Sequence, residues 1–204
     1  LRQRNTLLKT RAPQASIAPW TEQLINLAAT IAAERVKLVE LLNPLVTDNY
    51  RELNEVKPAS IIYKSNVENL SSDIEINTKL IADKLMEVQY QEVERGVTLV
   101  GPHRDDLILQ LGDFPAKGYA SHGESWSFAI SLKISALQLL KNQGLDPILI
   151  LDDVFAELDT NRRARLVQAT KLAEQTIVTA AVEGDLPADL NDTRFYVSNG
   201  KVSK

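Results

Sequence analysis

The chain has 204 residues, of which 44% are hydrophobic and 25% are charged, and its formal net charge is −4 at pH 7. This composition excludes a disordered chain, and no apolar run approaches the ~20 residues that a membrane-spanning helix needs. The absence of cysteine excludes disulfides and cysteine-ligated zinc, and we expect a cytoplasmic protein without a membrane partner. The acidic balance differs from the basic surface typical of nucleic-acid-binding domains, so any DNA contact is expected to be local.

The first eleven residues contain four basic side chains and no acidic one. Such a cluster can bind phosphate groups, but at a chain end it is more often a solvated terminus, and we favour the solvated terminus. The four residues are Arg2, Arg4, Lys9 and Arg11.

Apolar residues recur at three- and four-residue steps from Trp20 onward, which predicts a long amphipathic helix with Pro19 in its first turn. Pro44 is expected to kink or end this helix, because a proline removes one backbone hydrogen bond. Any continuation beyond Pro44 is expected to stop at Pro58. The apolar stripe consists of Leu24, Leu27, Ala28, Ile31, Leu38, Leu41 and Leu42.

A second helix is predicted over residues 80–95, after a short β-like run at residues 61–63. Arg95 followed by Gly96 is typical of a helix C-terminus. Residues 1–95 are therefore predicted to form a helical arm domain. Its charges are mixed, and we interpret it as a helical hairpin that packs on its neighbour.

Residues 96–204 alternate between strand and helix patterns, which predicts an α/β fold. Four consecutive apolar residues at 148–151 predict a buried strand. Asn199-Gly200 separates two short β-like runs, which predicts a terminal hairpin. The other predicted elements are strands at residues 97–100, 107–111 and 176–181, and helices at residues 124–141 and 161–172.

Two carboxylates, Asp152 and Asp153, directly follow the strand at residues 148–151. At the carboxyl end of a strand in an α/β sheet, one acid can hold Mg²⁺ against nucleotide phosphates. A second acid can orient or deprotonate an attacking water. Many buried strands instead end in an aspartate that only caps the next turn, and the residues alone leave both interpretations open.

The segment Ser121-His122-Gly123-Glu124 precedes a long helix pattern. Ser121 and Glu124 have the spacing of a capping box, and Gly123 allows a phosphate to approach the backbone at the positive end of the helix. A plain helix start is the simpler interpretation of this segment in isolation. His122 by itself indicates an exposed loop residue.

In their order along the chain, these segments resemble three motifs of ABC-type ATPases. Ser121 to Glu124 resembles the signature motif, residues 148–153 resemble the Walker B strand, and residues 157–159 resemble the D-loop. Three such motifs in the right order are far more specific than any one of them.

Within that superfamily, the chain resembles the RecF family of DNA-gap repair proteins. Three segments carry this resemblance: the opening segment from Arg2-Gln3-Arg4-Asn5 to Lys9, Gly-Pro-His-Arg-Asp-Asp-Leu at residues 101–107, and Leu-Asp-Asp-Val-Phe-Ala-Glu-Leu-Asp at residues 151–159. The resemblance is specific over about residues 96–182. Over the arm, mainly the arrangement of the predicted elements is similar.

The resemblance implies a partial ABC-type ATPase head, with the signature helix and the Walker B strand, in residues 96–204 beside the arm. In the family, two heads sandwich ATP and Mg²⁺, so the implied protein is an ATP-dependent homodimer and a weak ATPase. It would bind DNA at gaps or single-strand/double-strand junctions, with RecR- and RecO-type mediators as partners, in recombinational repair.

The resemblance also implies roles for particular residues. Asp152 would hold the magnesium shell, and Asp153 would be the catalytic residue that polarises the attacking water. The signature segment would bind the nucleotide of the partner head, and Asp159 would bridge the two heads. The implied cofactor-binding residues are Ser121, His122, Gly123, Glu124 and Asp159.

The chain departs from the family pattern at three places. Asp153 stands where most ABC-type ATPases carry glutamate, which favours slow turnover because the carboxylate is displaced by about one bond length. The switch histidine of the transporter ATPases is missing or is replaced by Thr179. No glycine-rich loop ending in Gly-Lys-Ser/Thr is found, since Gly200-Lys201 is followed by Val202. We therefore expect a C-terminal fragment that alone neither binds ATP tightly nor hydrolyses it.

The segment His103-Arg104 is predicted to lie in a turn between strands. Two roles are equally plausible for this turn. It contacts phosphate or DNA, or it is solvated and Arg104 forms an ion pair with Asp105 or Asp106.

Two other functions stay open. One is a stand-alone protein-interaction module whose acids are structural and whose arm binds a partner. The other is a metal-dependent nuclease that uses Asp152, Asp153 and Glu157, although a nuclease needs more clustered acids or a histidine.

Overall fold

The computed structural model describes residues 1–53, 57–156, 158–188, 190 and 193–204. In this part of the chain the helices are α1 (Arg2–Lys9), α2 (Gln14–Leu53), α3 (Ile74–Arg95), α4 (Ala116–Tyr119), α5 (His122–Asn142), α6 (Thr160–Thr170) and the 3-10 helix η1 (Glu183–Asp185). The strands are β1 (Ala59–Lys64), β2 (Asp106–Leu111), β3 (Phe114–Pro115), β4 (Ile148–Asp152), β5 (Gln175–Thr179), β6 (Tyr196–Ser198) and β7 (Lys201–Ser203).

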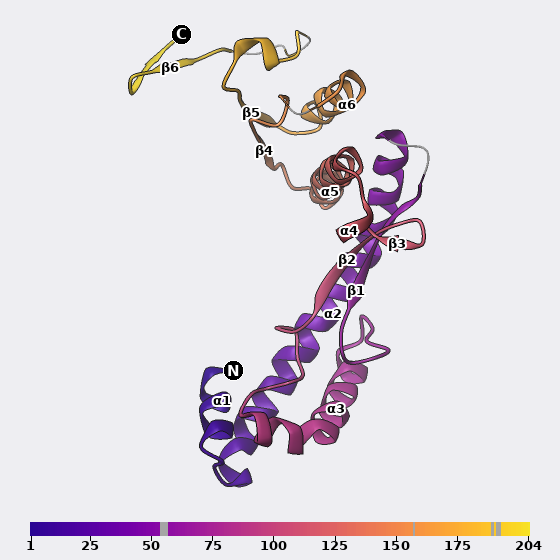
Figure 1. The fold of residues 1–204 in the computed structure, drawn as a ribbon, viewed down its shortest axis with the longest axis vertical. Helices are drawn as coiled ribbons and strands as arrows, with labels where there is room; N and C mark the ends of the chain where they lie inside the picture. The colour runs from indigo at the N-terminus through magenta and orange to yellow at the C-terminus, as the bar shows by residue number, and fades with distance from the viewer. Residues whose placement is uncertain (54–56, 157, 189, 191–192) are drawn as a thin grey trace.

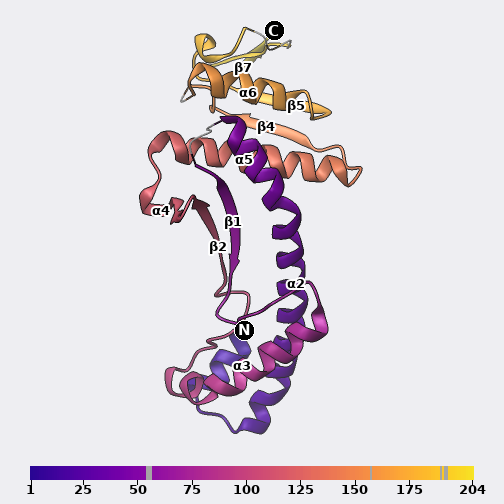
Figure 2. The ribbon, with the colours of Figure 1, turned by 90° about the vertical axis from the view of Figure 1, so that its right-hand side faces the viewer.

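The molecule is elongated, and α2 runs along much of its length (Figure 1). Helices α1 and α3 pack against α2 at one end, whereas α5 packs against it at the other (Figure 2). Strands β1 and β2 run alongside α2 between these ends. None of the described helices is long and apolar enough to cross a membrane.

Helix α2 begins earlier than predicted, at Gln14, and Pro44 does not end it. Beyond Pro44, Val46 and Tyr50 are fully buried in a core shared with β1, β2 and α5. The hydroxyl of Thr47 also donates a 2.8 Å hydrogen bond to the carbonyl of Ala59 in β1. We infer that this packing offsets the ~3 kcal/mol that a proline costs inside a helix.

The antiparallel pairing of β1 with β2 joins the two halves of the chain. Ala59 lies opposite Leu111 and Lys64 lies opposite Asp106. One strand comes from residues 1–95 and the other from residues 96–204, so the two parts share a sheet. The division into an arm domain and part of a head stays a prediction.

Residues 97–100 do not form the predicted strand. Two of their backbone N–H groups donate to side chains instead: Thr98 N donates to Asn5 Oδ1 at 2.8 Å, and Leu99 N donates to Glu92 Oε1 at 2.7 Å. Because these acceptors lie in α1 and α3, the segment follows the surface of the two helices rather than the edge of a sheet.

Arg4 is buried, so the expected solvated terminus is wrong for this residue. Its guanidinium forms an ion pair with buried Glu92 at 2.5 Å. It also donates to Thr98 Oγ1 at 2.8 Å and to Thr21 Oγ1 at 3.0 Å. One side chain thereby connects α1 with α2, α3 and the segment after α3. The other three basic residues near the N-terminus, Arg2, Lys9 and Arg11, are exposed as expected.

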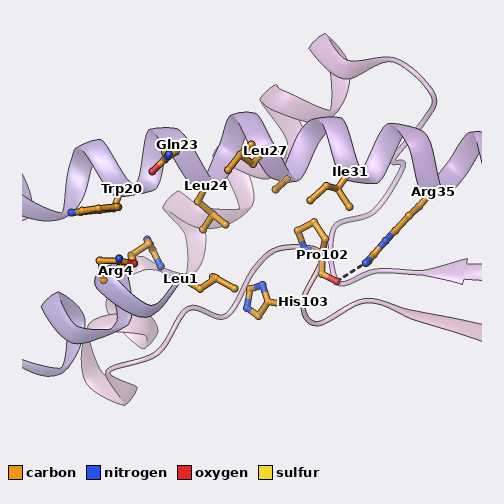
Figure 3. A pocket seen from close by; sticks show the side chains of 12 residues that line it. Leu1, Arg4, Trp20, Gln23, Leu24, Leu27, Ile31, Arg35, Pro102 and His103 are labelled. Carbon is orange, nitrogen blue, oxygen red and sulfur yellow. Dashed lines mark hydrogen bonds between the residues drawn. The ribbon is translucent and has the colours of Figure 1, made fainter.

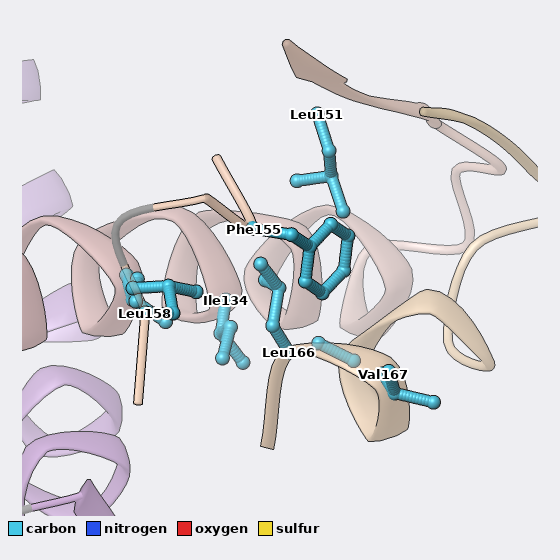
Figure 4. Packing of buried hydrophobic residues seen from close by; sticks show 8 residues of the cluster. Ile134, Leu151, Phe155, Leu158, Leu166 and Val167 are labelled. Atoms are coloured by element: carbon cyan, nitrogen blue, oxygen red, sulfur yellow. The ribbon is translucent and has the colours of Figure 1, made fainter. Parts of the chain in front are cut away.

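Strands β4 and β5 pair in parallel, and only one face of the pair is covered in the described part of the chain. Leu151 packs with Phe155 and Leu166 in the core between α5 and α6 (Figure 4). Ile148 and Ile150 are 56% and 65% exposed, so the prediction of a fully buried strand is wrong for this face. The four apolar residues indicated two buried faces, but α5 and α6 cover only one.

The hairpin predicted at the C-terminal end is confirmed. Strands β6 and β7 are antiparallel, and Asn199 and Gly200 between them have φ angles of 50° and 73°. Both values lie in the left-handed region that a two-residue type I′ turn requires.

Replacing Arg4 by methionine is expected to destabilise the protein by about 3–5 kcal/mol, because the substitution leaves Glu92 buried without its charged partner. Chemical denaturation measures the change in the free energy of unfolding. The matched control is Arg2→Met, which removes an exposed arginine from the same helix and is expected to change stability by less than ~0.5 kcal/mol. Equal effects of the two substitutions would contradict the structural role of the buried pair.

Candidate functional site

The start of α5 has the capping box that the sequence predicts. Ser121 Oγ accepts a hydrogen bond from Glu124 N at 3.2 Å, and Glu124 Oε2 accepts one from Ser121 N at 2.8 Å. Lys57, from the segment before β1, forms an ion pair with Glu124 at 2.8 Å. The carboxylate of Glu124 therefore fixes the first turn of α5 and also connects it to the region where α2 passes into β1.

Lys57 and the capping hydrogen bonds lower the pKa of Glu124 to about 2. The hydrogen bond from Lys57 is the largest cause, and those with the backbone and side chain of Ser121 follow. The charged form of Glu124 is therefore stabilised in the folded protein. This contribution to stability is present above the usual glutamate pKa of about 4.3 and is lost as the pH falls toward 2.

His122 lies in the first turn of α5 rather than in a loop, and it is exposed as expected. Its Nε2 accepts a 2.9 Å hydrogen bond from the indole nitrogen of Trp126, and the two rings meet edge to face at 6.3 Å. That ring nitrogen already has a donor within the chain, so the imidazole is oriented along α5.

Gly123 lies against the side chain of Arg162 from α6. A Cβ atom at position 123 would be 3.1 Å from Arg162 Nη2, which is a tight contact. Arg162 Nε donates to Ser127 Oγ of α5 at 2.8 Å, and Arg162 Nη1 forms an ion pair with Asp159. Asp159 also caps α6, because its Oδ1 accepts a 3.0 Å hydrogen bond from Arg162 N. The structure thus brings Gly123 and Asp159 to the two sides of one guanidinium.

Asp152 and Asp153 are exposed at the carboxyl end of β4, and Thr179 at the end of β5 contacts both of them. The Thr179 hydroxyl donates to Asp152 Oδ1. Asp153 N donates to Thr179 Oγ1 at 3.1 Å and to Thr179 O at 3.2 Å. Asp153 has a φ of 53°, which is uncommon for a residue other than glycine. Residues in such a conformation cluster at active sites, although Asn199 has a similar φ in a plain turn.

The oxygen atoms of Asp152 and Thr179 are donors of the kind that Mg²⁺ binds, together with water and phosphate oxygens. The residues therefore fit a magnesium ion that shares its coordination with a nucleotide. Among the described residues, no group of three or more acids, histidines and cysteines could hold a metal ion by itself. Glu157, which the nuclease hypothesis includes, lies outside the described residues.

The loop at residues 101–106 is held against the arm. Arg104 Nε donates to Thr98 O at 2.9 Å, so this nitrogen contacts the backbone rather than Asp105 or Asp106. Asp105 instead accepts a hydrogen bond from Tyr63 Oη. Burial is the largest cause that raises the pKa of Tyr63 to about 12, followed by the nearby carboxylate. Tyr63 is therefore neutral at physiological pH.

This loop also borders a groove of about 580 Å³ on α2 (Figure 3). Leu24, Leu27 and Ile31 of α2 line the groove together with Pro102 and His103. Arg35 closes one end, where its Nη1 donates to Pro102 O at 2.7 Å. The groove is mainly apolar, and none of the residues that line it is acidic.

Two residues of the site, Arg162 and Lys57, were not identified from the sequence. Arg162 follows Asp159 at the i,i+3 spacing of a helical ion pair, and this spacing was the signal available for it. Its contact with Ser127 spans 35 positions, and that of Lys57 with Glu124 spans 67. No local pattern indicates contacts over such separations.

Lys57→Met is expected to raise the pKa of Glu124 toward its usual value, because the ion pair is lost while the capping box remains. An NMR titration of the Glu124 side-chain carboxyl carbon measures this shift. Lys64→Met, which removes an exposed lysine at the end of β1, serves as the control and is expected to leave the titration unchanged. A Glu124 pKa that stays at its wild-type value in Lys57→Met would mean that the cap alone lowers it.

No protein-family model matches the chain. The chain is 43% identical to the DNA replication and repair protein RecF of Streptomyces avermitilis, and the match covers 100% of the chain and 58% of the relative. It is 41% identical to RecF of Cutibacterium acnes, over 99% of the chain and 57% of the relative. The chain thus spans somewhat more than half the length of the curated relatives it matches.

Two solved structures of the recombination mediator protein RecF in the RecFOR pathway share the fold. One is described as RecF-ATPrS, with a TM-score of 0.83, 25% identity and coverage of 99% of this chain and 55% of that chain. The other is described as RecF-ATP, with a TM-score of 0.83, 26% identity and coverage of 100% and 55%. These matches confirm the predicted α/β fold, a partial ATPase head with a helical arm, and fit the C-terminal part of a RecF protein. Over its whole length, the chain is thus similar to somewhat more than half of RecF, a DNA replication and repair protein.

Proposed function

We propose that this chain is part of an ATP-dependent DNA-binding protein that acts in recombinational repair and replication-gap processing. ATP binding drives two heads together on DNA. The observation that carries this proposal is the exposure of both candidate nucleotide segments. The capped start of α5 and the acids at the end of β4 face solvent. Exposure of both suits a nucleotide that is shared between two heads.

Each acid of β4 has its own role in the proposed site. Asp152 holds the magnesium shell, and its contact with Thr179 fixes one carboxylate oxygen. When bound, Mg²⁺ neutralises charge on the phosphates. Asp153 orients and polarises the attacking water, and the backbone hydrogen bonds to Thr179 hold its strained conformation. Because the aspartate side chain is short, turnover is slow.

The start of α5 acts on the nucleotide of the partner head. Ser121 and Gly123 bind the γ-phosphate at the positive end of the helix, where a first turn leaves backbone N–H groups without intrahelical acceptors. Glu124 supports this segment through the capping box and its ion pair with Lys57. His122 lies beside it, and Asp159 bridges the two heads.

The proposed partners follow from the relatives. The neighbours described as RecF-ATP and RecF-ATPrS support ATP as the nucleotide, and their place in the RecFOR pathway supports RecR- and RecO-type mediators. We propose that the protein binds gapped DNA with single-strand/double-strand junctions. The cytoplasm is its proposed location.

The test uses the parent protein, expressed with the residues that precede this chain. Ser121→Arg is expected to abolish ATP-dependent dimerisation, because the larger cation blocks the start of α5, while ATP binding by each monomer is retained. Analytical ultracentrifugation with and without ATP measures dimerisation, and calorimetry measures ATP affinity.

Ser72→Arg is the matched control, because it places the same group at an exposed serine of the arm. It is expected to dimerise like the wild type. Dimerisation of Ser121→Arg at the wild-type ATP concentration would contradict the proposal. The 204-residue chain alone, which carries no Gly-Lys-Ser/Thr loop, is expected to show no micromolar ATP affinity.

Asp153→Asn in the parent protein is expected to lower ATP turnover by about 10²–10⁴-fold while ATP-dependent dimerisation persists, because the amide cannot polarise the water. Steady-state phosphate release measures turnover. Incubation with Mn²⁺ and labelled DNA is the companion measurement. DNA cleavage that is lost in Asp153→Asn would favour a nuclease instead.

A further inference from the structure

We propose that Arg162 is a positioning residue that couples the contact of Asp159 with a second head to the start of α5. This inference rests on the proposed function, in which Asp159 bridges two heads and Gly123 lies at the shared nucleotide. It adds the residue that connects these two segments within one head.

The contacts of Arg162 join three segments through one side chain. Its Nε donates to Ser127 Oγ at 2.8 Å, its Nη1 forms an ion pair with Asp159, and its Nη2 lies 3.1 Å from the position of a Cβ atom on Gly123. A guanidinium is planar and presents its donors in a fixed fork, so these contacts fix one another's geometry. Asp159 is therefore the countercharge of the same group that packs on Gly123.

The two hydrogen-bond partners of Arg162, Ser127 and Asp159, differ in burial. Ser127 is fully buried inside its own head and cannot contact a second one. The side chain of Asp159 is 52% exposed, whereas that of Arg162 is 21% exposed. A second head can thus reach Asp159 directly, and Arg162 carries the effect to the inner side of α5.

The charges of Arg162, Asp159 and the start of α5 determine whether the coupling strengthens or weakens phosphate binding. The guanidinium lies beside the N-terminal end of α5, which carries partial positive charge, and two positive groups in proximity repel each other. Asp159 is the carboxylate that compensates for this repulsion. If a second head draws Asp159 away, Arg162 keeps its hydrogen bond to Ser127 but loses its countercharge. The start of α5 then becomes more positive, which strengthens its attraction for phosphate.

The test compares Arg162→Gln and Ser127→Ala in the parent protein. Each is expected to weaken ATP-dependent dimerisation by roughly tenfold, because a hydrogen bond to a charged group is lost. The ATP affinity of the monomer, measured by calorimetry, is expected to stay at its wild-type value. The double variant is expected to be no weaker than Arg162→Gln alone, since both substitutions break one connection. Arg162→Lys, which keeps the countercharge of Asp159, is expected to restore part of the dimerisation.

The control is Lys171→Gln, which removes a positive charge from the other end of α6 and is expected to leave dimerisation unchanged. Thermal unfolding of every variant separates lost stability from lost coupling. If Arg162→Gln lowers the melting temperature but dimerises like the wild type, or if the effects of the two substitutions add, the inference about Arg162 is overturned. If the wild-type parent does not dimerise with ATP, the proposed function itself is overturned as well.

Discussion

The contact between α2 and α5 is the constraint on which the rest of the structure depends. Asn49 of α2 is buried, and its Nδ2 donates to Ser135 Oγ at 2.9 Å and to Gln138 Oε1 at 2.8 Å on α5. The ring of Tyr50, the next residue of α2, packs against the ring of Phe128 on α5, with the centroids 5.6 Å apart. Ser135 is fully buried in this contact. This contact sets the direction of α5, and with it the place at which the capped helix start meets solvent.

Because α2 is a single helix, the position of α5 is tied to the arm. The same helix that holds α5 through Asn49 also holds α1 through the hydrogen bond of Arg4 to Thr21. A helix of 40 residues spans about 60 Å at 1.5 Å per residue, and its packing continues past Pro44. We therefore interpret the arm as a stiff extension of the head rather than a separate body.

Local chemistry could be predicted from the sequence, and contacts between distant residues could not. The capping box of Ser121 and Glu124 and the turn at Asn199-Gly200 each depend on neighbours within four positions, and both are confirmed. The burial of Arg4 depends on Glu92, which lies 88 positions away, so four basic residues near a chain end could not reveal it. The exposure of Ile150 depends on which elements cover the sheet, and an apolar run does not carry that information.

The same distinction applies to the candidate site and supports a nucleotide shared between two heads. Among the described residues, no hydrogen bond or ion pair joins residues 121–124 to Asp152 or Asp153. Each group is instead held by its own supports, Lys57 and Arg162 around the start of α5 and Thr179 beside the acids. Both groups are also exposed, which suits the proposed sharing of one nucleotide between two heads.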